Sequence, residues 1–230
     1  MTNSEEFIVL FNRIDNFLKN LQSKENHESF SKMVKRAAKS NAIIRQYKDD
    51  LIEFAELRNA IVHDHRNPPA IAEIHEYIVK EIRVIEEKLT KPKMVIPDFQ
   101  REVKTFQVND SLSDLLVVIR DKHYSQFPVY DGGEFKGLIT ENGIANWLAK
   151  NMIESQNSLK ETCLTEVLND EEETHTYKFI NRNTSVYEAE EIFKQRLNEG
   201  IKLAALLITH SGKRNESLLG MITPWDLINI

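Results

Sequence analysis

The sequence predicts a multidomain protein in which an all-α N-terminal helical bundle is followed by an α/β pair of repeats with pseudo-twofold symmetry. Two observations carry this prediction. In the first 93 positions apolar residues recur at three- and four-residue steps, whereas later short apolar strands alternate with helical segments. In addition, the segment Gly-Leu-Ile-Thr-Glu-Asn-Gly at 137–143 returns as Gly-Met-Ile-Thr-Pro-Trp-Asp at 220–226. We therefore predict domains at 1–93 and 94–230, with repeats at about 97–155 and 160–230.

Length and composition indicate a globular protein with a sizeable core. The 230 residues are 41% hydrophobic, which allows one or two domains. Cys163 is the single cysteine, so we expect neither an internal disulfide nor a zinc cluster, and a reducing compartment fits best. The acidic start has no basic n-region, and the longest apolar run is too short to cross a bilayer. We therefore expect a cytoplasmic protein with no membrane partner.

Charge is distributed unevenly along the chain. Residues 1–93 carry 16 Lys and Arg against 15 Asp and Glu, whereas residues 94–230 carry 14 against 21. The acidic half is a poor candidate for nucleic acid, and no DNA binding is predicted. Within the first half, four cations at i, i+3, i+4 and i+7 share one helix face: Lys32, Lys35, Arg36 and Lys39. This face is either an ordinary solvated surface or a track for RNA.

Three helices and then a longer one are expected in the first domain. Apolar spacing predicts a helix over 4–21, a second from about Ser29 and a third that ends near His65. Asn67-Pro68-Pro69 must interrupt the helical run. The isoleucine spacing from Ile71 to Leu89 then marks a helix of about 20 residues, and Pro92 and Pro97 bracket a linker.

Beyond the linker, helices and strands alternate. The first repeat is expected to run from a helix over 111–122 through strands at 127–130 and 135–140 to a helix through Trp147. A turn at Asp131-Gly132-Gly133 is expected between the two strands. The second repeat has the same order, with strands expected at 177–181, 203–209 and 217–223, a helix at 185–197 and a final helix from Pro224. Residues 165–168 and the acidic run 170–173 form the connection between the halves.

Both copies of the repeat, with Ser125–Tyr130 ahead of the first, resemble a tandem pair of CBS domains over about residues 97–230. The resemblance implies a regulatory module that dimerises and binds an adenosine nucleotide or a related adenosyl ligand in clefts between the repeats. It does not distinguish AMP, ADP and ATP. In the family pattern, the Thr after the second strand and an acidic residue three positions later hold the phosphate and the ribose.

Thr223 and Asp226 match this pattern, with Pro224 between them. A carboxylate that accepts from two vicinal hydroxyls, beside a Thr at a helix N-terminus, suits a ribose phosphate. The alternative is structural, because Thr at the N-cap, Pro at N1 and a carboxylate at N3 also begin a helix. By the resemblance, four apolar residues would enclose the purine: Phe179, Ile180, Ala205 and Leu206.

The first copy departs from the pattern. Gly143 stands where Asp226 stands in the second copy, so the ribose clasp is missing there. We therefore expect one nucleotide per chain, at the Thr223/Asp226 cleft, and an empty or weak cleft at Thr140.

A further motif lies late in the first domain. Arg58, the polar Asn59 and, four positions later, His63 resemble the signature of the HEPN superfamily over about residues 4–90. Many active members are metal-independent ribonucleases that work as homodimers, whereas others only dimerise or bind partners. The resemblance therefore implies a homodimer and leaves open whether this domain is an endoribonuclease, with RNA as its substrate.

In such an enzyme, His63 would transfer the proton of the RNA 2′-hydroxyl and Arg58 would stabilise charge on the phosphate. Asn59 lies one turn before His63 and could orient its imidazole. Arg58 lies about 140° away around an ideal helix, so the site needs either an unwound helix end or a second protomer. The structural alternative pairs Arg58 with Glu53 or Glu56 and places His63 at a helix C-terminus. A metal site is not predicted, because positions 63 and 65 point apart on a helix.

The sequence thus predicts a homodimeric regulator in which the repeats sense an adenosine nucleotide and the helical domain is the output. In a second interpretation the helical domain is non-catalytic and only dimerises or binds a protein partner. In a third, the repeats bind no ligand and are purely structural.

Overall fold

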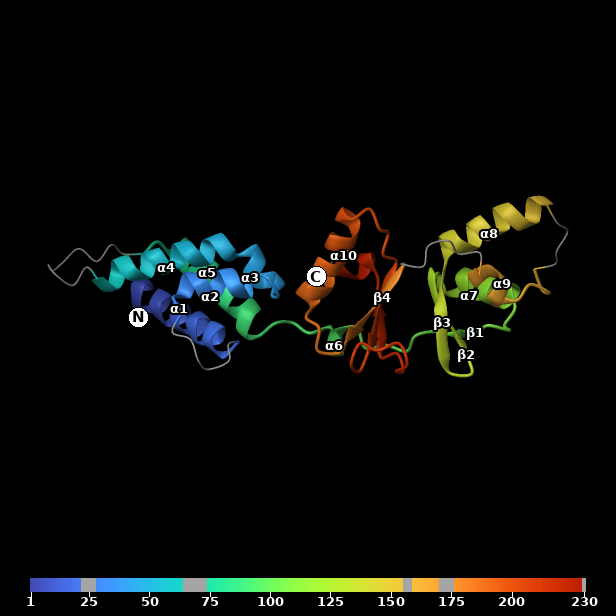
Figure 1. The fold of residues 1–230 in the computed structure, drawn as a ribbon, viewed down its shortest axis with the longest axis horizontal. Coiled ribbons are helices and arrows are strands. Elements are labelled where there is room, and N and C mark those ends of the chain that lie inside the picture. The colour runs from blue at the N-terminus through green and yellow to red at the C-terminus, as the bar shows by residue number, and fades with distance from the viewer. Residues whose placement is uncertain (22–27, 64–73, 155–158, 170–175, 229–230) are drawn as a thin grey trace. The chain divides into compact units, whose positions relative to one another are not determined.

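The fold is that of a computed structural model, which describes residues 1–21, 28–63, 74–154, 159–169 and 176–228. The chain forms two compact units, one of residues 1–93 with 185–188 and the other of residues 94–184 with 189–230. A helical N-terminal region is thus followed by an α/β region, as predicted (Figure 1).

The first unit is built from helices (Figure 1). The hydroxyl of Thr2 accepts from the Glu5 amide at 3.2 Å, and the Glu5 carboxylate accepts from the Thr2 amide at 2.8 Å, which starts the first helix. The apolar stripe of this helix is buried, with Phe7 and Ile14 fully inaccessible. The helices are α1 (Asn3–Asn20), α2 (Phe30–Ala37), α3 (Ala42–Gln46), α4 (Lys48–His63) and α5 (Glu76–Thr90).

Two helices of this unit differ from the prediction. The last helix has 15 residues rather than about 20, because His75 is an extended N-cap and the buried Ile74 lies outside the helix. The short α3 was not predicted, and it forms because the Asn41 side chain caps the Ile44 amide at 3.0 Å. The predicted interruption at Pro68-Pro69, with His65 and Ile71, lies outside the described residues.

The rest of the chain contains two three-stranded sheets of the same design. In the order β1-β2-β3, the first pair is parallel and the second antiparallel, and β4-β5-β6 repeats this arrangement. The elements are α6 (Val95–Asp98), β1 (Phe106–Gln107), α7 (Leu112–Lys122), β2 (Gln126–Asp131), β3 (Glu134–Thr140), α8 (Glu141–Glu154), α9 (Leu164–Asn169), β4 (Tyr177–Asn181), α10 (Val186–Asn198), β5 (Ala205–Thr209), β6 (Gly220–Ile222) and the 3₁₀ helix η1 (Pro224–Leu227). The matching sheets agree with the predicted repeat, while a pseudo-twofold axis remains a prediction.

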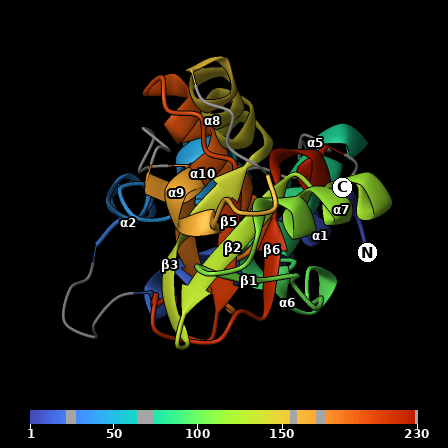
Figure 2. The same cartoon turned by 90° about the vertical axis from the view of Figure 1, so that its right-hand side faces the viewer.

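The hairpin between β2 and β3 turns at two glycines. Gly132 and Gly133 have φ angles of 56° and 92°, which residues with a Cβ rarely adopt, so the predicted Asp-Gly-Gly turn is present. The hairpin brings β3 back beside β2, and the strand then leads directly into α8. Figures 1 and 2 both show α8 at this end of β3.

An apolar cluster joins the two sheets. Phe135 and Leu138 of β3 pack against Ala205 and Leu207 of β5, and all four are buried. Arg214 adds a polar link, since its Nη2 donates to the Phe135 carbonyl at 2.9 Å. The two repeats of the α/β unit are therefore held together by shared core residues.

Two C-terminal predictions need correction. The strand expected at 217–223 is limited to Gly220–Ile222, because Glu216 folds back to accept hydrogen bonds from Ser211 and closes the preceding loop. The final helix is a single 3₁₀ turn, Pro224–Leu227. The predicted connection at 165–168 belongs to α9, whose Val167 is fully buried. The acidic run at 170–173 lies outside the described residues.

Candidate functional site

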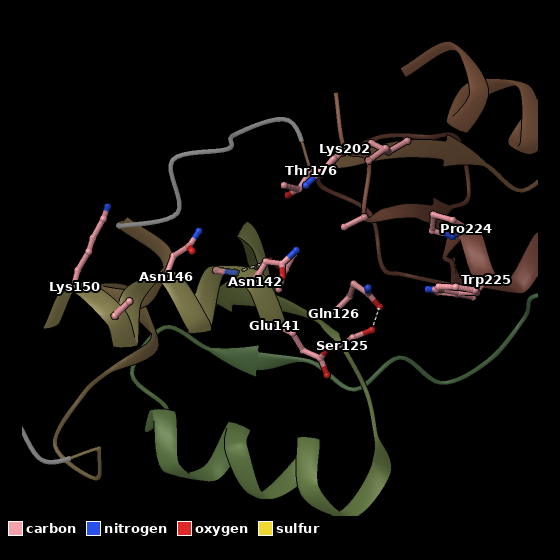
Figure 3. Close-up of a pocket in the computed structure, with 15 residues that line it drawn as sticks. Ser125, Gln126, Glu141, Asn142, Asn146, Lys150, Thr176, Lys202, Pro224 and Trp225 are labelled. Atoms are coloured by element: carbon pink, nitrogen blue, oxygen red, sulfur yellow. Dashed lines mark hydrogen bonds between the residues drawn. The ribbon is translucent and has the colours of Figure 1, made fainter. Parts of the chain in front are cut away.

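A cleft with a volume of about 810 Å³ opens in the α/β unit where β3 passes into α8 (Figure 3). Its size lies within the range of small-molecule sites, about 300–1,000 Å³. Both repeats contribute to its walls. The lining residues are Ser125, Gln126, Thr140, Glu141, Asn142, Gly143, Asn146, Ala149 and Lys150 from the first repeat, and Thr176, Lys202, Leu203, Ala204, Pro224 and Trp225 from the second.

The first wall is the beginning of α8. The buried Thr140 hydroxyl accepts from the Gly143 amide at 3.0 Å, so Thr140 caps the helix. Asn142, Asn146 and Lys150 follow at four-residue steps and therefore share one face of the helix (Figure 3). The N-terminus of α8 and, farther along the same face, the ammonium of Lys150 favour an anionic ligand, whereas the carboxylate of Glu141 in the first turn opposes one.

The opposite wall comes from the segments that lead into β4 and β5. The Ala204 amide donates to the Thr176 carbonyl at 2.6 Å, which fixes these two segments to each other. Thr176 and Leu203 are buried, whereas Lys202 is exposed. Figure 3 shows Thr176 and Lys202 on the side of the cleft away from Asn146 and Lys150. A ligand between these walls would therefore meet a lysine on each side.

The remaining surface combines polar and aromatic groups. The Ser125 hydroxyl donates to the Gln126 side-chain oxygen at 2.8 Å, beneath the cleft in Figure 3. Pro224 and Trp225 form the far edge, and both are exposed. The cleft thus offers amide, hydroxyl, ammonium and aromatic groups and one carboxylate, that of Glu141, and the two lysines and the aromatic edge suit a ligand with an anionic part and a planar part.

The second copy of the motif has the helix-cap arrangement. The Thr223 amide and hydroxyl each donate to the Asp226 carboxylate at 2.7 Å. Arg101 donates to both oxygens of the same carboxylate, at 3.2 and 3.0 Å, and to the Met221 carbonyl at 2.7 Å. Of the residues predicted to hold ribose and phosphate, Pro224 lines the described cleft, whereas Thr223 and Asp226 are engaged with each other and with Arg101.

These contacts also set the charge state of Asp226. Partial burial acts to raise the pKa of its carboxyl, but the hydrogen bonds from Thr223 and the guanidinium of Arg101 outweigh burial. The pKa therefore lies below its usual value, and Asp226 is ionised at neutral pH.

The four residues predicted to enclose a purine lie in or near the sheet of the second repeat. Ile180, Ala205 and Leu206 are buried, and none of the four is among the residues that line the described cleft. Phe179 packs edge-to-face against Phe135, with ring centroids 5.1 Å apart. Ala204, one position before the predicted Ala205, does line the cleft. In the described structure these side chains serve mainly as core, and their role toward a ligand remains a prediction.

The Arg58/His63 motif lies on one helix. α4 runs without interruption from Lys48 to His63, so the two positions are about 140° apart around its axis. The half-buried Arg58 donates to the Asn59 side-chain oxygen at 3.3 Å. The helix alone therefore does not bring Arg58 beside His63, whose side chain lies outside the described ones.

Three of the four cations of the predicted basic face lie on α2, and Lys39 follows the end of this helix at Ala37. Lys32, Lys35, Arg36 and Lys39 are exposed, while Met33 and Val34 between them are buried. Arg36 pairs with Glu28 at 3.1 Å. Across the described parts of the chain, no group of three or more His, Cys, Asp or Glu is placed to hold a metal ion. None of the helices that the structure describes has the length and hydropathy needed to span a bilayer.

Sequence reasoning missed most of the α8 wall. Asn146 and Lys150 continue the spacing of Asn142 along a predicted helix, and this polar stripe was the available signal. Thr176 and Lys202 carried no such signal, since only the pairing of their segments brings them to the cleft.

One part of the chain matches a known protein family. A model of the CBS domain matches residues 96–150, and no curated protein matches the chain. Among solved structures, similar ones include a candidate signal-transduction protein with CBS domains from Burkholderia ambifaria MC40-6, with 23% identity over 57% of this chain and 84% of that chain, and a TM-score of 0.43. A second is a conserved CBS domain protein of unknown function from Thermoplasma acidophilum, with 16% identity over 59% and 67% and a TM-score of 0.43.

A third similar structure is the CBS domain of a bacterial CNNM/CorC family Mg²⁺ transporter in complex with ATP, with 19% identity over 64% of this chain and 91% of that chain, and a TM-score of 0.43. The segment matched by the family model contains β1 to β3, α7 and most of α8, including Thr140, Asn146 and Lys150 of the cleft. Residues 96–150 of this chain are therefore a CBS domain.

Proposed function

We propose that this protein senses an adenosine nucleotide, AMP, ADP or ATP, with one molecule bound per chain in the cleft beside α8. This cleft is lined by Thr140 and Gly143, so the proposal reverses the expectation from the sequence that the Thr140 cleft is empty or weak. The observation that carries the proposal is the cleft itself, about 810 Å³ in volume and lined by both repeats, at the end of a CBS domain. The sequence resemblance to CBS pairs supplies the ligand class. The walls supply groups suited to it, with a helix N-terminus and lysines for phosphate and an aromatic edge for a base.

Lys202 provides the first test. It is exposed on the wall opposite α8, and removing one ammonium that meets a phosphate should weaken binding by about tenfold, or about 1.4 kcal/mol. Lys202→Ala should therefore lose more affinity for ATP than for AMP in isothermal titration calorimetry. Lys178→Ala is the matched control, because Lys178 is exposed on β4 and does not line the cleft. Equal affinities of wild type and Lys202→Ala for all three nucleotides would contradict the proposed placement.

The predicted clasp by Thr223 and Asp226 is the competing placement. For Asp226 to accept ribose hydroxyls, it must give up the donors that it now holds, above all Arg101. The variant Asp226→Ala distinguishes the two placements. A nucleotide affinity within twofold of wild type favours the cleft beside α8, whereas a loss of nucleotide affinity of tenfold or more favours the clasp. A stoichiometry of two nucleotides per chain would exclude the single-site proposal in either form.

For the helical unit we propose a homodimeric HEPN-like output domain under the control of the nucleotide. In its enzymatic version, Arg58 of one protomer and His63 of the other, with Asn59, form a metal-independent endoribonuclease site. The unbroken helix α4 supports this version of the motif, because one straight helix separates the two positions by about 140°. The exposed cations of α2 would then hold RNA.

A mixing experiment tests the shared site. Arg58→Ala and His63→Ala should each abolish RNA cleavage, whereas co-expression of the two variants should restore part of it, because some dimers then contain one intact pair. Cleavage is measured on a labelled RNA with EDTA, with and without nucleotide. Activity that survives both single substitutions would exclude this ribonuclease. If the wild type cleaves no RNA but sediments as a dimer, the non-catalytic alternative, a dimerising or partner-binding domain, holds.

A further inference from the structure

Trp225 is the most exposed large aromatic residue at the cleft. Its side chain is 77% exposed in η1, whereas the other tryptophan, Trp147, is 2% exposed in the core of the first repeat. An indole is a large apolar surface, and its exposure to water is unfavourable unless something covers it. A wide aromatic ring at the edge of a cleft is typical of a binding surface.

The backbone that carries this ring is fixed on both sides. Pro224 restricts φ immediately before Trp225, and the carboxylate of Asp226 immediately after it accepts from Thr223 at 2.7 Å. Arg101 ties Asp226 to the Met221 carbonyl of β6. The backbone of such a turn loses little freedom when a ligand packs on the ring, so the cost of ordering is limited to the side chain of Trp225.

The position of the ring gives the cleft two chemically different ends. Figure 3 shows Pro224 and Trp225 at one end, Asn146 and Lys150 at the other, and Gln126 between them. A nucleotide has the same polarity, with a planar base at one end and anionic phosphates at the other. The ends match when the base lies at Trp225 and the phosphates lie between the α8 wall and Lys202 of the opposite wall.

We propose that Trp225 is the base-stacking residue of this cleft, and that it selects ligands that carry a planar heteroaromatic ring. The assignment rests on the proposed nucleotide function and adds the group that reads the base. Stacking on an aromatic side chain tolerates every base, because each base has a π face. Trp225 therefore separates nucleotides from sugar phosphates and polyphosphate, and does not separate adenine from guanine.

The full-length chain with Trp225→Ala, Trp225→Phe or Lys202→Ala tests this assignment by calorimetry with AMP, ADP and ATP. Loss of stacking should weaken binding by about 5- to 150-fold, which corresponds to about 1–3 kcal/mol. The fold-loss in Trp225→Ala should be the same for all three nucleotides, since they share the base, whereas the loss in Lys202→Ala should grow with phosphate number. Trp225→Phe should stay within about threefold of wild type.

A control and a second measurement complete the test. Tyr77→Ala removes an aromatic ring that is 56% exposed on α5 of the helical unit, and it should leave nucleotide affinity unchanged. Because Trp147 is buried, the exposed component of tryptophan fluorescence comes from Trp225. Nucleotide should quench this component in the wild type, and the quenching should be absent in Trp225→Phe.

The outcomes separate the stacking role from the proposed function. If the wild type binds no nucleotide, both fail. If it binds but Trp225→Ala binds equally well, or loses affinity in proportion to phosphate number, only the stacking role fails. If Trp225→Ala binds nucleotide normally and instead loses a self-association that the wild type shows, Trp225 is a docking residue between copies, and the stacking role is overturned.

Discussion

Asp226 is held by three donors at once, the amide and hydroxyl of Thr223 and the guanidinium of Arg101. At the scale of the residue, this explains why the carboxylate begins η1 and why its pKa is below the usual value. The same contacts make Asp226 a poor acceptor for further hydroxyls unless Arg101 moves. The Asp226 carboxylate can therefore either cap η1 or bind a ligand at the second motif, and the two roles compete.

The lowered pKa of Asp226 predicts a dependence of stability on pH. Because the folded-state pKa lies below the unfolded value of about 3.9, the stabilisation is complete above that pH and is lost as pH falls through the folded pKa. Asp226→Ala should lower the stability of the α/β unit at pH 7 by about 1 kcal/mol, the usual cost of a lost cap. Between pH 5 and 2 its stability should fall less than that of wild type.

Urea unfolding followed at several pH values measures this difference. Arg101→Ala serves as a control that keeps the cap but removes one charged donor, so its loss at pH 7 should be smaller, about 0.2–1 kcal/mol. If the free energy of unfolding falls equally with acid in wild type and in Asp226→Ala, Asp226 does not cause the loss of stability at low pH.

At the scale of the element, the two copies of the repeated strand have different neighbours. Gly220 of β6 pairs with Gln100, and a Cβ there would lie 2.0 Å from the Phe99 carbonyl oxygen. For a Cβ at Gly137 of β3, the three nearest atoms all belong to the Leu168 side chain, the closest at 2.7 Å. Residues 99–101 therefore lie directly against β6. Their contact leaves no room for a side chain at Gly220.

This difference predicts unequal costs of the same substitution. Gly220→Ala should destabilise the α/β unit by about 3 kcal/mol or more, the upper end of the cost of overpacking. The cost is high because backbone atoms must move to make room for the methyl group. Gly137→Ala should cost about 1 kcal/mol, because the end of a leucine side chain can rotate away. Thermal unfolding of both variants checks the order, and a larger loss in Gly137→Ala would contradict the observed pairing of 99–101 with β6.

At the scale of the whole molecule, each unit has its own apolar core. The helical core includes Phe7, Ile44 and Ile82, and the α/β unit has clusters around Phe127 and around Phe135. Separate cores allow separate unfolding transitions. A ligand that binds only the α/β unit should then stabilise one transition selectively.

Scanning calorimetry should therefore resolve a nucleotide-dependent transition. Nucleotide at 100 times its dissociation constant should add about 2.7 kcal/mol to the α/β unit. The same nucleotide should shift the Trp225→Ala protein less at equal concentration, while the Tyr77→Ala protein should match wild type. The absence of a shift with AMP, ADP and ATP would instead support repeats that are purely structural.

Local patterns in the sequence were sufficient for most of the secondary structure. The apolar stripe of α1, the Asp-Gly-Gly turn and the order of helices and strands in both repeats follow from periodicity and from the backbone freedom of glycine. Patterns failed where a partner distant in the chain decided the outcome. The strand at β6 was shortened by Glu216 and Ser211, and α9 became ordered because Leu164 and Val167 are buried in the core of the first repeat.

The sequence by itself determined the residue types of the candidate site, the repeated motif, the match to a CBS domain at 96–150 and the possibility that Thr223 and Asp226 cap a helix. Only the tertiary structure decided where the cleft lies, because its walls come from segments as far apart as Ser125 and Trp225. It also introduced Arg101, which is 125 positions from Asp226 and binds its carboxylate. Hydrogen bonds and packing between such distant positions depend on the folded path of the chain, and no local pattern encodes them.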